Sequence, residues 1–186
     1  GKALYIGGWA PEDVDGDGIQ ETVGLVEKRV LVSPVNSKKI YLSSWKWGWI
    51  FDIGVDSSTS RIWAVGSYDD FNDKIHSLIV IFDRDLEVLK VIDYPEGSEG
   101  YLGRFYGIAF DGKQYAYIAG SEGVAKFSVD GELVAINRDG KSRLKIVYGY
   151  NYLYTFRNER IEGYRRHVLY IHDTNLNLVK KYVLSE

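Results

Sequence analysis

The sequence predicts an all-β fold, and three observations lead to this prediction. The chain is rich in aromatic residues, with 15 Tyr, 5 Trp and 7 Phe among 186 residues, and aromatic and β-branched side chains pack well on pleated sheets. Short apolar segments recur between turns made of Gly, Asp, Asn and Ser, as in proteins built from many short strands. No segment shows a convincing period of 3.6 residues, so we expect almost no helix.

A weak internal repeat organises the predicted strands. In order along the chain, four segments begin with an aromatic residue followed by small or apolar residues: Tyr5-Ile6-Gly7-Gly8, Trp63-Ala64-Val65-Gly66, Tyr117-Ile118-Ala119-Gly120 and Tyr154-Thr155-Phe156-Arg157. We expect each to be followed by a variable loop, a second strand, a tight polar turn and a third strand. The predicted turns are residues 34–37, 83–85, 130–131 and 173–175.

Three of the four units also begin with an additional strand. These strands are predicted at residues 50–55, 107–110 and 144–148, whereas the first unit has none. The total is therefore about fifteen strands, where four complete four-stranded units would need sixteen.

Antiparallel four-stranded units that repeat every 40 to 50 residues or so are typical of β-propellers. The chain resembles propeller repeats in general, without the signature of a particular class. This resemblance implies about four blades, with strands A to D from inside to outside and strand A missing from the first. We expect residues 1–186 to form a single domain or part of a larger propeller. The alternative is a β-sandwich, which also contains many short alternating strands; the repeated aromatic strands and hairpins favour the propeller.

Composition limits the function and the location of the protein. A net charge of -3 provides no basic surface for nucleic acid, and no apolar run approaches the ~20 residues that span a membrane. With no Cys, disulfides and thiolate metal sites are excluded. The sequence contains neither Met nor a signal peptide. We interpret it as a secreted or cell-surface product whose leader is not part of this chain.

Residues 13–21 have the spacing of a calcium-binding loop, with oxygen ligands at alternate positions and a glycine at the sixth. The candidate ligands are Asp13, Asp15, Asp17, the backbone carbonyl of Ile19, and Glu21. The segment resembles the Asp-x-Asp-Gly-Asp-Gly loops of integrin-type propeller repeats, with Glu in place of the final Asp. Gly24 occupies the position where a helix–loop–helix calcium motif has Glu, so that motif is disfavoured. We expect a structural Ca²⁺ here; the alternative is a solvated acidic turn.

In a propeller, the B–C loops and the D-to-A connections emerge on one face, and long loops on a rigid scaffold often carry binding residues. Here these segments are residues 13–21, 67–73, 157–166, 43–49 and 94–101. The candidate ligand-binding residues on this face are Trp9, Trp45, Trp47, Tyr101 and Arg160. The tryptophans of 45–49 alternate, so in an extended chain they form a stacking platform suited to sugars. The alternative is that they pack between blades.

Enzyme motifs are not found in the sequence. His76, His167 and His172 lack metal-ligand spacing, and no nucleophile elbow or phosphate-binding loop occurs. We therefore prefer a domain that binds a carbohydrate or an extracellular protein, while leaving catalysis open. Two alternatives remain: a metal-dependent propeller hydrolase or lyase, and a structural subunit of an extracellular assembly, in which homo-oligomerisation would complete the first unit.

Overall fold

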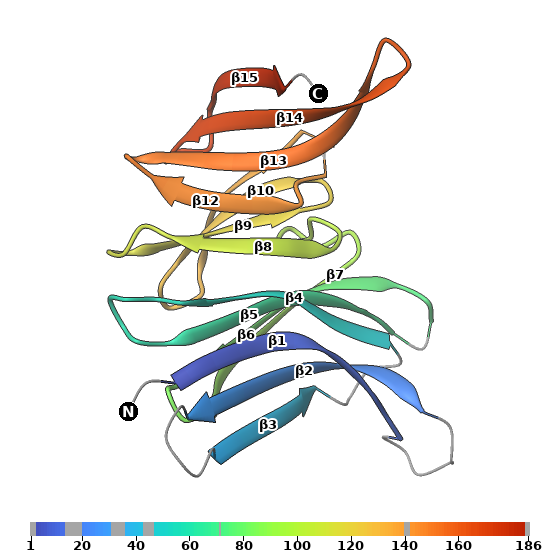
Figure 1. The fold of residues 1–186 in the computed structure, drawn as a ribbon, viewed down its shortest axis with the longest axis vertical. Helices are drawn as coiled ribbons and strands as arrows, with labels where there is room; N and C mark the ends of the chain where they lie inside the picture. Colours follow the sequence, from blue (N-terminus) through green and yellow to red (C-terminus); the bar gives the residue numbers. More distant parts are fainter. Residues whose placement is uncertain are drawn as a thin grey trace.

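The computed structural model describes residues 3–13, 20–30, 36–42, 47–70, 72–139 and 142–184. These residues form fifteen strands and no helix, so the prediction of an all-β fold is confirmed (Figure 1). In this part of the chain there is accordingly no helix that could cross a membrane.

The strands form four sheets in chain order. The first sheet contains β1 (Ala3–Glu12), β2 (Glu21–Val30) and β3 (Asn36–Leu42). The second contains β4 (Trp47–Val55), β5 (Ile62–Asp69), β6 (Ile75–Phe82) and β7 (Val88–Pro95). The third contains β8 (Phe105–Phe110), β9 (Tyr115–Gly120), β10 (Gly123–Ser128) and β11 (Leu133–Arg138). The fourth contains β12 (Lys145–Gly149), β13 (Tyr152–Ile161), β14 (Tyr164–Asp173) and β15 (Leu178–Leu184).

Each sheet is an antiparallel meander of consecutive strands. A single parallel pair, Thr22 with Trp47, connects the first sheet to the second. Because β2 runs parallel to β4, β1 runs antiparallel to it. The three strands of the first sheet therefore have the directions of the second, third and fourth strands of the other sheets, as the sequence predicts.

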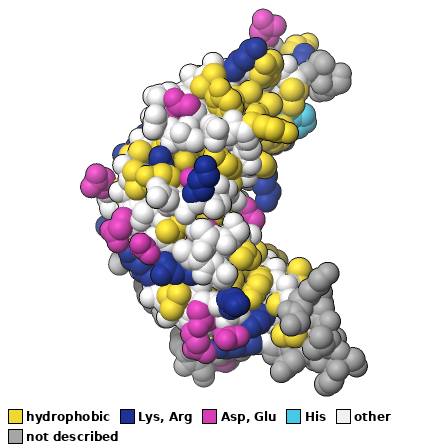
Figure 2. All heavy atoms as spheres, turned by 90° about the vertical axis from the view of Figure 1, so that its left-hand side faces the viewer, with side chains coloured by type: hydrophobic (Ala, Val, Ile, Leu, Met, Phe, Trp, Pro, Cys, Tyr) yellow, Lys and Arg dark blue, Asp and Glu magenta, His cyan; other side chains and the backbone are white. Residues whose placement is uncertain are grey.

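The four sheets are stacked along the long axis of the molecule (Figure 1), and the stack is curved. Figure 2 shows a crescent with a hollow on one side. Strands β4, β8 and β12 follow one another along this concave side, and β1 packs against β4 where the first sheet lacks its own first strand. We call β1, β4, β8 and β12 the inner strands.

An apolar layer fills each space between neighbouring sheets. Because side chains alternate between the two faces of a strand, β5 packs against both neighbouring sheets. Ile62 and Ala64 pack with first-sheet residues such as Val26, whereas Trp63 and Val65 pack against the third sheet. Strands buried on both faces read as continuous apolar runs, which explains why β5, β6, β9 and β10 lack polar alternation.

The aromatic residue of the sequence repeat has the same role in successive sheets. Tyr5, Trp63 and Tyr117 each belong to the apolar layer between their own sheet and the next one along the chain. Trp63 and Tyr117 are fully buried. Tyr154 holds the equivalent position in the fourth sheet, where its neighbour Leu153 faces the third sheet, so Tyr154 lies on the outer face.

The hairpins that join the last two strands of sheets two to four share one geometry. A polar side chain at the first turn position accepts a hydrogen bond from the backbone N–H four residues later, at distances of 2.9 Å for Asp83, 3.1 Å for Ser128 and 2.9 Å for Asp173. The fourth turn position has positive φ and is occupied by Leu86, Gly131 and Leu176. The polar turns predicted at 83–85, 130–131 and 173–175 are therefore confirmed.

Candidate ligand-binding site on the concave side

Two β-bulges on the inner strands each add an aromatic residue. The register of β4 shifts between Ile50 and Asp52, and the register of β8 shifts between Phe105 and Gly107, so Phe51 and Tyr106 are the extra residues. A bulged residue leaves the ladder and its side chain is re-aimed. The rings of Phe51 and Tyr106 meet edge to face, with centroids 5.0 Å apart, and both residues are half-buried.

Charged groups lie beside this aromatic pair. The Asp52 carboxylate accepts hydrogen bonds of 3.0 Å from the backbone N–H groups of Ile53 and Ile108, and the second of these connects β4 to β8. The Nζ of Lys145 on β12 lies 4.0 Å from Asp52 Oδ1, and the Lys145 side chain is largely exposed. Three successive inner strands therefore contribute an aromatic pair, a fixed carboxylate and an accessible ammonium group to one surface.

Trp49 and Arg104 extend this surface toward the loops. The Arg104 guanidinium lies over the Trp49 ring, 5.0 Å from its centroid, and 3.8 Å from Asp69. The backbone of Arg104 is fixed by two hydrogen bonds with Ser121, one from its N–H to Ser121 Oγ and one from Ser121 N–H to its carbonyl. A cation over an aromatic face is attracted by the ring quadrupole, so this pair is preorganised.

These hydrogen bonds connect a turn within the third sheet to the segment that joins the second and third sheets. Arg104 belongs to the connection between the second and third sheets, and Ser121 belongs to the B–C turn of the third. The Ser77 hydroxyl on β6 likewise donates to the carbonyl of Gly103. The turn between β9 and β10 and the connection between the second and third sheets therefore lie at the same edge.

A polar network braces the loop end of the second sheet. Tyr68 donates to Asp93 at 2.6 Å, and the His76 ring, stacked on Tyr68, has Nδ1 2.8 Å from Asp93 and Nε2 3.5 Å from Asp70. Burial, followed by the hydrogen bond to Asp93, raises the pKa of Tyr68, so its phenol stays protonated. The Asp70 carboxylate accepts from the N–H groups of Asn72 and Lys74, as expected for an ordinary polar loop.

No group of three His, Asp or Glu side chains is placed to hold a metal ion among the residues described. The calcium prediction falls largely outside them: Asp15, Asp17 and Ile19 are not described, and of Glu21 only the backbone is. Asp13 is described and exposed at the end of β1. The calcium loop therefore stays a prediction.

The predicted ligand-binding residues are only partly brought together. Trp9 is 60% exposed, on the side of β1 that carries Gly7, whose backbone abuts Ile50 of β4. Trp47 begins β4 opposite Thr22, close to the end of the calcium-type loop, although its side chain is not described. Trp9 and Trp47 thus belong to adjacent inner strands near the loops.

The other three candidates have different positions. Trp45 lies outside the described residues. Tyr101 is half-buried, and its carbonyl accepts from Arg138 Nε at 3.4 Å. Arg160 is exposed and paired in register with Arg165 in the fourth sheet, so it does not join Trp9 at the first sheet.

The sequence prediction did not include Phe51, Asp52 or Tyr106. A signal was present, because the expected alternation breaks at Ile50-Phe51-Asp52 and again at Phe105-Tyr106-Gly107. An extra residue that interrupts the period of two is what a bulge requires.

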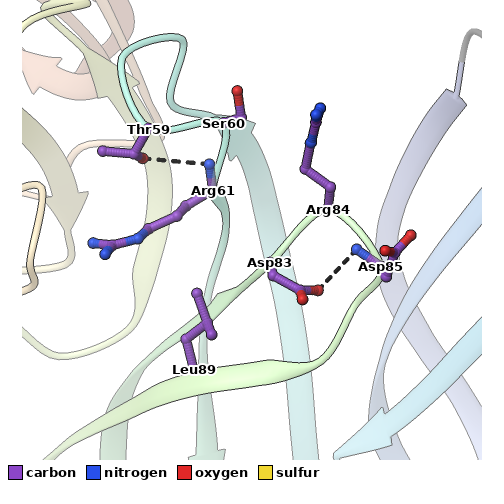
Figure 3. Close-up of a pocket in the computed structure, with 7 residues that line it drawn as sticks. All are labelled: Thr59, Ser60, Arg61, Asp83, Arg84, Asp85 and Leu89. Carbon is purple, nitrogen blue, oxygen red and sulfur yellow. Dashed lines mark hydrogen bonds between the residues drawn. The ribbon is translucent and has the colours of Figure 1, made fainter.

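A separate pocket of about 340 Å³ lies between two turns of the second sheet (Figure 3). Several of its polar groups are engaged in contacts within the fold. Asp83 accepts from the N–H of Asp85, Arg61 donates to Val129 and Asp130 of the third sheet, and Asp85 pairs with Lys28 of the first sheet. These contacts fasten neighbouring sheets together at the turn edge, and we assign the pocket a structural role.

No protein-family model matches the chain, and no curated protein is significantly similar to its sequence.

Proposed function

We propose that the chain is a β-propeller-type binding domain, secreted or on the cell surface, which takes a carbohydrate on its concave side. The curved stack of antiparallel sheets, with one strand of each along the hollow, supports the propeller over the sandwich (Figure 2). The observation that carries the functional proposal is the Phe51–Tyr106 pair, flanked by Asp52 and Lys145.

The chemistry of this surface suits a sugar. Binding sites for small molecules combine aromatic surface with a few fixed polar groups that set orientation. Here the aromatic rings offer a face for the C–H groups of a pyranose. Asp52 accepts and Lys145 donates hydrogen bonds to hydroxyl groups, and the preorganised Arg104–Trp49 pair continues the surface. An extracellular protein would use the same aromatic and charged groups and is the second ligand class to test.

Replacing both bulged aromatics tests the proposal. We expect the double variant Phe51→Ala, Tyr106→Ala to weaken oligosaccharide binding about tenfold or more, since buried aromatic anchors dominate recognition. Binding would be detected on a glycan array and quantified by calorimetry. The matched control is Tyr150→Ala, which removes a 93% exposed aromatic from a turn at the opposite edge. Absence of any glycan binding by the wild type, or equal binding by both variants, would refute the carbohydrate proposal.

We also propose that residues 13–21 hold a structural Ca²⁺. Besides the ligand spacing, the backbone register pairs Glu12 with Glu21 where the loop leaves the sheet. Carboxylates that converge without a cation repel one another, and a bound cation would remove this cost and hold the loop next to the start of β4. Loops of ordinary affinity are occupied at the millimolar calcium found outside cells.

Calcium is expected to raise the melting temperature of chelator-treated protein. At 100 times the dissociation constant, a ligand specific for the folded state stabilises it by about 2.7 kcal/mol, or about 5 to 10 °C for a domain of this size. Asp15→Ala should abolish the shift, whereas Glu96→Ala, an exposed carboxylate in another loop, should retain it. If added calcium leaves the melting temperature of the wild-type protein unchanged, the proposal of a calcium site at residues 13–21 is wrong.

A further inference from the structure

The candidate carbohydrate surface has two cationic side chains whose hydrogen-bond donors are not used within the fold. The Nζ of Lys145 lies 4.0 Å from Asp52, and the two oxygens of Asp52 already accept backbone N–H groups of β4 and β8. The guanidinium of Arg104 lies 3.8 Å from Asp69. Both distances are longer than a hydrogen bond. Within the part of the chain that the structure describes, both cations therefore keep their N–H donors for a ligand.

Arg104 is held in place without having its donors occupied. Its guanidinium lies over the Trp49 ring, and its backbone forms two hydrogen bonds with Ser121. The neighbouring Asp69 has a buried Oδ1 atom that accepts no hydrogen bond from the described residues, so this carboxylate attracts the guanidinium but does not cap it. The Arg104 side chain is 33% exposed. A fixed guanidinium with free donors is thus accessible from solvent.

The group that matches such a guanidinium best is a carboxylate. Arginine presents a planar fork of N–H donors, which two carboxylate oxygens meet in parallel, and hydrogen bonds between charged partners are roughly twice as strong as neutral ones. A sugar hydroxyl carries no charge and brings a donor together with its acceptor. It would therefore use only part of what Arg104 offers.

Arg104 is also placed beside the surface proposed for a sugar ring. Trp49 and Arg104 each precede a member of the bulged aromatic pair by two positions, which corresponds to about 7 Å along an extended strand. Beyond the aromatic pair, Asp52 and Lys145 offset each other's charge and together offer an acceptor and a donor to hydroxyl groups. The surface is therefore asymmetric, with a site for an anionic group on the Arg104 side and a site for hydroxyl groups on the other.

We propose that the carbohydrate is acidic: the carboxylate of a uronic acid binds Arg104 while a sugar ring lies on the bulged aromatic pair. This inference rests on the proposed carbohydrate function and adds to it the substrate class and the residue that selects this class. Arg104 distinguishes acidic from neutral sugars, whereas Asp52 and Lys145 contact hydroxyl groups that both kinds of sugar have.

Paired ligands test the substrate class. A glycan array would carry oligosaccharides of uronic acids, each beside its carboxyl-reduced neutral form, and calorimetry would quantify binding. We expect the acidic form to bind about tenfold or more tightly, since hydrogen bonds to charged groups are the stronger ones, and added salt should reduce this preference. Equal binding of both forms, or a preference for the neutral form, would overturn the acidic-sugar inference and leave the carbohydrate proposal intact. Absence of any glycan binding would remove both.

A variant of Arg104 tests the assigned residue. Arg104→Gln should abolish the preference for the acidic form and change binding of the neutral form little. Arg104→Lys, which keeps the charge but loses the planar fork, should give an intermediate preference. The matched control is Arg84→Gln, which alters an exposed arginine in the turn between β6 and β7 and should keep the wild-type preference. Circular dichroism and melting temperature verify that the variants fold. A preference for the acidic form that survives Arg104→Gln would overturn the inference.

Discussion

Replacing Trp63 with alanine is expected to lower the free energy of unfolding by about 3 to 5 kcal/mol, the usual cost of truncating a large buried aromatic. Trp63 is fully buried in the layer between the second and third sheets. Its ring meets Phe110 edge to face, with centroids 5.8 Å apart. Hydrogen-bonded sheets border this apolar layer on both sides. The layer therefore cannot collapse into the cavity that the indole ring leaves, and the lost packing contacts are not replaced.

Urea denaturation followed by circular dichroism would measure this change. Trp9→Ala is the matched control, because Trp9 is 60% exposed, and we expect its effect to stay within about 0.5 kcal/mol. Equal effects from the two tryptophans would mean that the layers between sheets do not form the stabilising core.

Acidification between pH 6.5 and about pH 4 is expected to cost the wild type up to about 3 kcal/mol through His172. This side chain is 2% exposed in the space between the third and fourth sheets. Burial, followed by the nearby charge of Arg143, lowers the pKa of His172 from 6.5 to about 4. Each pKa unit corresponds to about 1.4 kcal/mol.

The direction in which stability changes with pH depends on whether the folded or the unfolded state binds the proton more readily. The unfolded chain protonates His172 below about pH 6.5, while the folded protein resists protonation until about pH 4. The stability that depends on the lowered pKa is therefore complete above pH 6.5 and is lost as the pH falls through this window.

Comparing the pH dependence of unfolding in two variants isolates this contribution. His172→Gln should flatten the slope between pH 6.5 and 4, whatever its effect at neutral pH. His167→Gln alters an exposed histidine on the opposite face of β14 and should keep the wild-type slope. A slope unchanged by His172→Gln would contradict the assignment.

The strands and hairpins could be predicted because their signals are local. Alternation, aromatic content and turn residues such as Asp83 and Asp173 act within a few positions, and the structure places strands and turns there. The sequence also predicted three strands for the first unit, and the first sheet of the described residues contains β1, β2 and β3. The curvature of the stack has no such local signal, because it arises from how successive sheets pack.

The candidate site was harder to predict for the same reason. Phe51 and Tyr106 meet only because β4 and β8 bulge at corresponding points. Arg143 shows most clearly what local sequence could not predict. Its sequence context suggests a solvated loop, yet it is 1% exposed, stacked over Tyr170 at 4.2 Å and paired with Asp139. Its burial depends on the position of the fourth sheet relative to the third, which neighbouring residues do not encode.

The face-to-face layers have a consequence for how the molecule loses its structure. Extensive packing in the described chain connects each sheet only with its immediate neighbours, as in solenoids, whose energetics are a sum of repeat and nearest-neighbour terms. The middle sheets have two such couplings and the terminal sheets one. Opening should therefore begin at the ends of the crescent and propagate inward, with the second and third sheets as the last cooperative unit to melt.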